Sequence, residues 1–306
     1  MQSLRIYLLG KLRIQCNERD LPGLEARKVQ ELFTFLLLNR HTIHNREKLA
    51  ALFWENQTTA NSKKYLRQTL WQLQTALDGD TNDCPTLLVD DEWIQFNPAC
   101  VFWLDVGILE EAFTAAARIP GANLSLAQAN QVEQAVQLYS GELLAGWYQD
   151  WCIFERERLQ SIYLGLLDKL IGYYEAHEQY TLGIAHALLI LQQDRARECT
   201  HRQLMRHYYL SGDRTGALRQ YEACTLALQE ELAVDPAQST VALYQQICND
   251  SLRSNSSAET IPPSIPTGSN LNEVLQTLLQ LQQGVKALST QLESCVHAIE
   301  RTIQRP

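Results

Sequence analysis

The sequence predicts a mostly α-helical protein with a small amount of β-structure near its N-terminal end. Three observations carry this prediction. Apolar residues alternate with polar ones over residues 4–16, they recur every three or four residues from Val29 onward, and everything from Asp105 to about Asn249 has a helical pattern. The 306 residues, 45% of them hydrophobic, are enough for two domains with a sizeable core and a tail.

Short strands are expected at both ends of the first hundred residues. Residues 4–9 and 11–16 read as two strands, and the polar residues 17–20 read as a turn. Further along, residues 86–89 and 93–96 flank an acidic Asp-Asp-Glu sequence and predict a β-hairpin. The sequence therefore predicts a small N-terminal sheet and a separate hairpin.

Three helices are expected between these strands. The first contains Val29, the second begins after Asn45, which is a good N-cap, and the third runs from about Thr59 to Leu77. An order of two strands, three helices and a hairpin is that of a winged helix-turn-helix with an additional N-terminal sheet. We assign this domain to residues 1–103.

The second predicted domain, residues 104–250, contains an internal repeat. Apolar and small residues recur after 34 residues, a period typical of tetratricopeptide helix pairs: Leu170, Tyr174, Gly183, Ile184 and Ala187 correspond to Leu204, Tyr208, Ala217, Leu218 and Tyr221. Pro236 is expected to end the second repeat, and residues 240–247 read as a capping helix. We therefore expect an all-α, tetratricopeptide-like domain.

The last part of the chain is expected to be a linker followed by a coiled-coil helix. Residues 251–270 are rich in Ser and Pro, which predicts a disordered linker. Residues 271–303 carry apolar side chains at heptad spacing, which predicts a homo-oligomer: Leu271, Val274, Leu278, Leu281, Val285, Leu288, Leu292, Cys295 and Ile299. The alternative is that this helix folds back on the repeats.

Charge is distributed unevenly along the chain. The formal net charge is −9, yet residues 1–75 hold 12 Lys and Arg against 6 Asp and Glu, whereas residues 76–306 hold 14 against 29. A basic end on an acidic chain is typical of a protein that contacts nucleic acid through that end. We therefore expect double-stranded DNA as a partner.

The third predicted helix is the candidate DNA-recognition helix, because the second helix of a helix-turn-helix pair enters the major groove. Its apolar positions, Leu66, Leu70, Leu73 and Leu77, form the core stripe, and no acidic residue occurs between Thr59 and Leu77. Lys and Arg neutralise phosphates, and Gln pairs with adenine. The predicted DNA-binding residues are Lys63, Lys64, Arg67, Gln68, Trp71 and Gln72, with Arg46 and Lys48 from the second helix.

The alternative for this face is an ordinary solvated helix surface, which is the default for charged residues. An outward-facing Trp71 argues against it.

Arg27 and Lys28 at the start of the first helix are expected to add phosphate contacts. The hairpin tip, residues 90–92, is acidic and would repel phosphate, so it is expected either to stay away from DNA or to face another protein.

These residues resemble the SARP-type (antibiotic regulatory protein) transcriptional activators. In the N-terminal part the resemblance lies in residues 4–10, Arg27-Lys28, residues 46–54 and the third helix. In the second part it resembles the bacterial transcriptional activation domain, in residues 139–146, Trp151, 155–159, 201–205, 211–214, 221–224 and 230–236. The sequence departs from the family at Gln72, Gln74 and Thr75, where an Arg-rich helix end is usual, and at the acidic hairpin tip.

The resemblance implies a transcriptional regulator, most simply an activator. It implies sequence-specific binding to promoter DNA and contact with RNA polymerase or another protein through the helical domain. An alternative is an interaction adaptor that keeps the fold without binding DNA; the acidic tip and the exposed Trp71 favour it.

Other classes of protein are not expected. The sequence has no Walker, G-x-S-x-G or H-E-x-x-H motif, so we predict no enzyme activity and no cofactor. Its eight cysteines show no metal-ligand spacing, and Asp194, Glu198 and His201 read as structural. Without a signal peptide or a long apolar run, the chain is expected to be a cytoplasmic protein of a bacterium, with no membrane partner.

Overall fold

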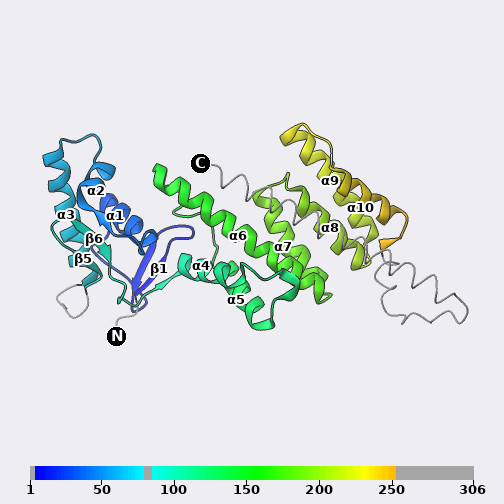
Figure 1. The fold of residues 1–306 in the computed structure, drawn as a ribbon, viewed down its shortest axis with the longest axis horizontal. Helices are drawn as coiled ribbons and strands as arrows, with labels where there is room; N and C mark the ends of the chain where they lie inside the picture. Colours follow the sequence, from blue (N-terminus) through cyan, green and yellow to red (C-terminus); the bar gives the residue numbers. More distant parts are fainter. Residues whose placement is uncertain (1–3, 79–84, 253–306) are drawn as a thin grey trace, which may run out of the picture. The chain divides into compact units, whose positions relative to one another are not determined.

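A computed structural model describes residues 4–78 and 85–252, and the chain up to Asp250 forms one compact unit. Strands and three helices alternate up to Leu104, and helices follow from Asp105 onward (Figure 1). This confirms the predicted mostly α-helical class. Most of the predicted linker and the whole heptad segment, residues 271–303, lie outside the described residues.

The N-terminal sheet has four strands in the order β3-β2-β1-β7. They are β1 (Leu4–Tyr7), β2 (Arg13–Cys16), β3 (Arg19–Asp20) and β7 (Trp103–Leu104). Strands β1, β2 and β3 are antiparallel neighbours, whereas β7 pairs with β1 in parallel. The sheet therefore joins the first residues of the chain to the segment that leads into the helical part.

Two predictions about this sheet were wrong in detail. The first strand ends at Tyr7, not at residue 9, and the predicted turn at residues 17–20 contains strand β3. The turn itself is confined to Asn17 and Glu18, whose φ angles are 51° and 66°. Two successive residues with positive φ are the geometry of a tight hairpin, so Arg19 can pair directly with Cys16.

The remaining N-terminal elements are three helices and a second, three-stranded sheet of order β4-β6-β5. They are α1 (Arg27–Leu38), β4 (His44–Asn45), α2 (Arg46–Phe53), α3 (Thr59–Asp78), β5 (Leu87–Val89) and β6 (Trp93–Phe96). The strand β4 was not predicted, since two residues give no periodicity. Phe33, Leu73 and Phe96 are fully buried between helices and sheet. Together these elements form a winged helix-turn-helix.

The rest of the unit is helical, as predicted, with one exception. The helices are α4 (Asp105–Ala116), α5 (Leu126–Gln137), α6 (Asp150–Ala176), α7 (Tyr180–Gln193), α8 (Glu198–Leu210), α9 (Arg214–Leu232) and α10 (Gln238–Cys248), with a 3-10 turn η1 at Gly121–Asn123. Residues 138–149 are not helical, although the sequence pattern suggested it.

The non-helical segment is used as an edge of the N-terminal sheet. Gly10 donates its N–H to the carbonyl of Glu142, and Leu144 donates to the carbonyl of Leu8, both at 2.9 Å. Leu143 and Leu144 are fully buried. A helix here would leave the end of β1 without hydrogen-bond partners, so pairing with this edge overrides the local helical pattern.

The predicted repeat corresponds to the helix pairs α6–α7 and α8–α9. The equivalent residues Leu170 and Leu204 are both fully buried. Gly183 on α7 is packed so closely against α8 that an added Cβ would lie 2.1 Å from the ring of His207. The small residue is therefore required by the approach of two helices, as the repeat pattern suggested.

Candidate nucleic-acid interface

A local side-chain cap sets the start of α2, and ring contacts join α2 to α3. The side chain of Asn45 accepts hydrogen bonds from the backbone N–H groups of Glu47 at 3.0 Å and Lys48 at 3.2 Å, so α2 begins where the sequence predicts. The ring of Trp54, just after α2, lies 6.4 Å from that of Tyr65 on α3. These contacts fix how α3 is presented.

One face of α3 is buried in the core. Leu66, Leu70 and Leu73 are at most 3% exposed, and Leu77, also expected in this stripe, is half-buried. Ser62 and Thr69 complete the buried face. Because this face is buried, the rotation of α3 about its axis is fixed. A defined set of side chains therefore lies on the opposite face.

The outward face of α3 carries most of the predicted DNA-binding residues. Lys64, Arg67 and Gln68 are exposed, Gln72 is half-buried, and the indole of Trp71 is 65% exposed. Lys64 and Arg67 make no ion pair with any residue that the structure describes. Their charges are therefore available to an outside anion.

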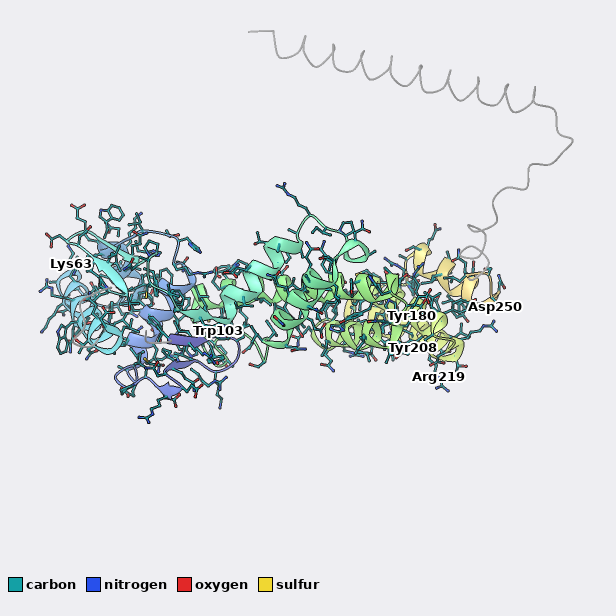
Figure 2. The ribbon with its side chains drawn as sticks, turned by 90° about the horizontal axis from the view of Figure 1, so that it is seen from below. Lys63, Trp103, Tyr180, Tyr208, Arg219 and Asp250 are labelled. Carbon is teal, nitrogen blue, oxygen red and sulfur yellow. The ribbon has the colours of Figure 1, made fainter. Side chains whose placement is uncertain are left out.

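Two of the other predicted residues are already engaged, and Lys48 has no ion pair with the residues that the structure describes. Lys63 (Figure 2) forms an ion pair of 2.5 Å with Glu47 at the start of α2. This lysine holds the pKa of the Glu47 carboxyl below its usual value. Arg46 is half-buried, and its guanidinium donates to the carbonyl of Asp90 at 2.5 Å. Lys48 is exposed.

The wing hairpin is fixed against the start of α2. The N–H of Arg46 donates to the carbonyl of Glu92 at 2.9 Å, in addition to the side-chain bond to Asp90. The Asp90 carboxylate accepts from the N–H groups of Glu92 and Trp93, at 2.8 and 2.6 Å, and these bonds lower its pKa. These bonds therefore favour the negatively charged form of Asp90 at the tip. Sequence reasoning missed this role of Arg46, because β4, which brings it to the wing, has no sequence signal.

Comparison with known proteins identifies the second part of the chain. Residues 104–248 match the family model of the bacterial transcriptional activator domain. Mycobacterium tuberculosis EmbR, solved in complex with a low-affinity phosphopeptide, has a similar fold: the TM-score is 0.65 at 20% identity, over 85% of this chain and 69% of that one. No curated protein matches the chain.

Residues 104–248 therefore belong to the family of bacterial transcriptional activator domains. The recognised activator domain and the winged-helix fold together confirm the resemblance that the sequence suggested.

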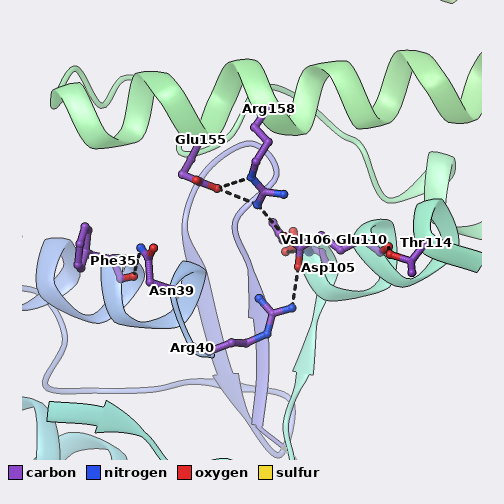
Figure 3. A network of polar contacts seen from close by, with 9 residues as sticks. All are labelled: Phe35, Asn39, Arg40, Asp105, Val106, Glu110, Thr114, Glu155 and Arg158. Atoms are coloured by element: carbon purple, nitrogen blue, oxygen red, sulfur yellow. Dashed lines mark hydrogen bonds and ion pairs between the residues drawn. The ribbon is translucent and has the colours of Figure 1, made fainter. Parts of the chain in front are cut away.

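A polar network joins the winged-helix part of the unit to the activator domain (Figure 3). Glu110 on α4 accepts from Arg40, just after α1, and from Arg158 on α6, at 2.6 Å in both cases. Arg158 also pairs with Glu155 at 2.8 Å. Nearby, the Asp105 carboxylate is 1% exposed and accepts three backbone N–H groups, from Leu8, Leu9 and Val106.

The regulator uses Arg27 and Lys28 at the same junction. Both pair with Glu31, which is 3% exposed, at 3.0 and 2.8 Å. The Arg27 guanidinium also lies 3.8 Å from the ring centre of Trp147, and Gln149 donates to Glu31 at 2.6 Å. Arg27 therefore supports the junction, and Lys28 pairs within α1; their phosphate contacts stay a prediction.

The residues read as structural in the regulator's repeats have satisfied partners. Glu198 accepts from the N–H of Ala237 at 2.7 Å at the start of α10, and the two ring nitrogens of His201 contact Arg195 and Gln220. Among residues 4–78 and 85–252 no group of His, Cys, Asp and Glu is arranged to hold a metal ion. Within the same residues, no helix combines the length and the apolar character needed to cross a bilayer.

Proposed function

We propose that this regulator binds promoter DNA through the outward face of α3 and contacts RNA polymerase or another protein through its helical domain. The proposal divides the chain at residues 103 and 104, into a reading domain and an activation domain, and places it in the bacterial cytoplasm. One observation carries it: α3 presents cations that have no ion pair with the described residues, together with amides, on a face without a carboxylate, and the buried core fixes its rotation.

A gel-shift series over increasing salt tests the DNA contact. We expect Lys64→Ala/Arg67→Ala to bind the chain's own upstream DNA at least tenfold more weakly. The plot of log affinity against log salt should become less steep, by about 1.8 in slope, because two phosphate contacts are lost. Arg219 on α9 (Figure 2) is exposed, and Arg219→Ala is the matched control. Unchanged binding by the double variant would remove α3 as the reader.

A second candidate function is an adaptor that binds protein instead of DNA. The acidic wing favours it, since Asp91 and Glu92 are exposed beside a half-exposed Trp93. Selection of duplexes from a random library separates the two functions. The adaptor requires that no DNA be selected while a specific protein partner is recovered.

We also propose that the regulator self-associates through residues 271–299, which lie outside the described residues. The support is the sequence alone, in which nine apolar residues keep heptad register. Truncation after Ser257 should reduce the mass measured by light scattering to that of one chain. An unchanged mass would defeat this part of the proposal. A dimer would suit DNA with two half-sites.

A further inference from the structure

Two carboxamide side chains share the outward face of α3. Asn61 and Gln68 are seven residues apart, which places them within about 20° of each other around a helix. Both are exposed, and Lys64 lies between them on the same face. Gln68 was predicted from the sequence as a DNA-binding residue, whereas Asn61 was not. The helix α3 begins at Thr59, as expected, so Asn61 lies within its first turn.

The spacing of the two amides matches a whole number of base pairs. Seven residues at the usual rise span about 10.5 Å along the helix. Successive bases of one DNA strand are about 3.4 Å apart, so the same distance covers about three base pairs. A helix lying along the major groove would therefore bring the two amides to bases about three positions apart.

The chemistry of the amides points to adenine. A carboxamide accepts from the N6 amino group of adenine and donates to its N7, a pairing that no other base offers in the major groove. Arg67, which would favour guanine, lies on the flank of this face, about 100° around the helix from Gln68. The acidic wing makes minor-groove reading unfavourable, so base selection falls to α3.

Apolar groups follow the second amide along the face. Trp71 is one turn beyond Gln68 and is 65% exposed. The Thr75 hydroxyl donates to the carbonyl of Trp71 at 2.8 Å, so its hydrogen-bonding capacity is used within the helix. Apolar side chains contact the C5-methyl group of thymine in the major groove. An A·T pair near Gln68 would offer its thymine methyl to Trp71.

We propose that α3 selects two adenines about three base pairs apart, one read by Asn61 and one by Gln68, with a thymine methyl against Trp71. The inference rests on the proposed DNA binding by α3 and adds its base preference. Lys64, between the two amides, supplies affinity for phosphate without choosing a base.

Selection from a random duplex library by the full chain tests this preference. We expect two A·T pairs about three positions apart. Gln68→Ala should lose the preference at one position and Asn61→Ala at the other, each by about tenfold against G·C, while binding to unrelated DNA is kept. Lys64→Ala is the matched control, which should weaken binding to all sequences alike and reduce the salt slope by about 0.9.

Each outcome supports or overturns the preference. Selected sequences with G·C at both positions would overturn it, as would Gln68→Ala and Asn61→Ala variants that select the same sequences as the unchanged chain. If the chain binds no duplex at any salt concentration, the proposed DNA binding fails and the preference fails with it. Tight binding without the paired A·T positions defeats the preference alone.

Discussion

Charged side chains are placed differently in α3 and in the repeats α6–α9. On α3, Lys64 and Arg67 are exposed and have no ion-pair partner among the described residues. In the repeats, Arg197 pairs with Asp168, and Arg206 pairs with Glu175 at 2.6 Å. The first set is available to an outside anion, whereas the second set connects one helix to the next. The same residue types are therefore left without an ion pair in one region and connect helices in the other.

The junction between the two regions follows the second pattern. Asp105 uses its carboxylate on three backbone N–H groups, and Glu110 connects two arginines from different elements. We therefore expect substitutions of these groups to lower the stability of the protein and to leave its DNA affinity unchanged. Substitutions on the outward face of α3 should lower DNA affinity and leave stability unchanged.

The largest effect is expected at Asp105. Asp105→Ala leaves three backbone N–H groups without their acceptor in a buried place, and should lower the free energy of unfolding by about 3 kcal/mol. Asp105→Asn, which keeps one oxygen acceptor, should recover part of it. Urea unfolding measures both, with Asp150→Ala, at an exposed position on α6, as control. A loss below about 1 kcal/mol would mean that Asp105 does not anchor the junction.

A smaller, pH-dependent effect is expected at Glu175. The nearby ring of His207, whose Nε2 lies 3.4 Å from the carboxylate, and hydrogen bonds from Arg206 lower its pKa from 4.5 to about 2 in the folded protein. Its contribution to stability is therefore present above pH 4.5 and is lost as the pH falls towards 2. Glu175→Gln should cost about 1 kcal/mol at neutral pH and flatten the acid limb of the stability profile.

Thermal unfolding between pH 2 and 7 measures this effect. Exposed Glu222 on α9 provides the control variant Glu222→Gln, which should keep the acid limb of the unchanged protein. An identical acid limb in the Glu175 variant would show that this carboxylate does not connect α6 to α8.

Sequence reasoning found the elements with a clear period and missed those that depend on pairing across the chain. The buried stripe of α3 and the Asn45 cap were predicted from local pattern, since both arise within a few residues. The strands β4 and β7 have two residues each, too few for a period, and form because β6 and β1 offer them partners.

The candidate site shows the same division. Exposure of Lys64, Gln68 and Trp71 followed from the helix period alone. That Lys63 and Arg46 are engaged could not be predicted, because Glu47 and the wing reach them only through tertiary contacts. Local spacing thus predicted which face is outward, and the fold decided which cations on it are unpaired.

Substitutions in the wing are expected to raise DNA affinity moderately, whereas those on α3 lower it. Asp91 and Glu92 are exposed carboxylates whose side chains make no ion pair with the described residues. Asp91→Lys/Glu92→Lys should raise DNA affinity severalfold at low salt, because repulsion of phosphate is replaced by attraction. The free energy of unfolding should stay within about 0.5 kcal/mol of the unchanged protein.

Gel shifts at two salt concentrations measure the change. Glu111 and Glu222 are exposed on α4 and α9, so Glu111→Lys/Glu222→Lys makes the same change in net charge away from the wing. If both double variants gain equally, the effect belongs to net charge and the wing does not approach DNA.

The smallest difference is expected between two neighbouring lysines. Lys63 is paired with Glu47 at 2.5 Å, whereas Lys64 is unpaired among the described residues. Lys63→Ala removes a charge that Glu47 already offsets, so DNA affinity should fall no more than about twofold, and Lys64→Ala should cause the larger loss. Glu47→Gln releases Lys63 and should raise affinity in the unchanged chain but not in Lys63→Ala. Gel shifts of Lys63→Ala, Lys64→Ala, Glu47→Gln and Glu47→Gln/Lys63→Ala measure these affinities. Equal losses for Lys63→Ala and Lys64→Ala would mean that an ion pair within the protein does not withhold a cation from DNA. The difference between paired and unpaired cations would then have no effect on DNA binding.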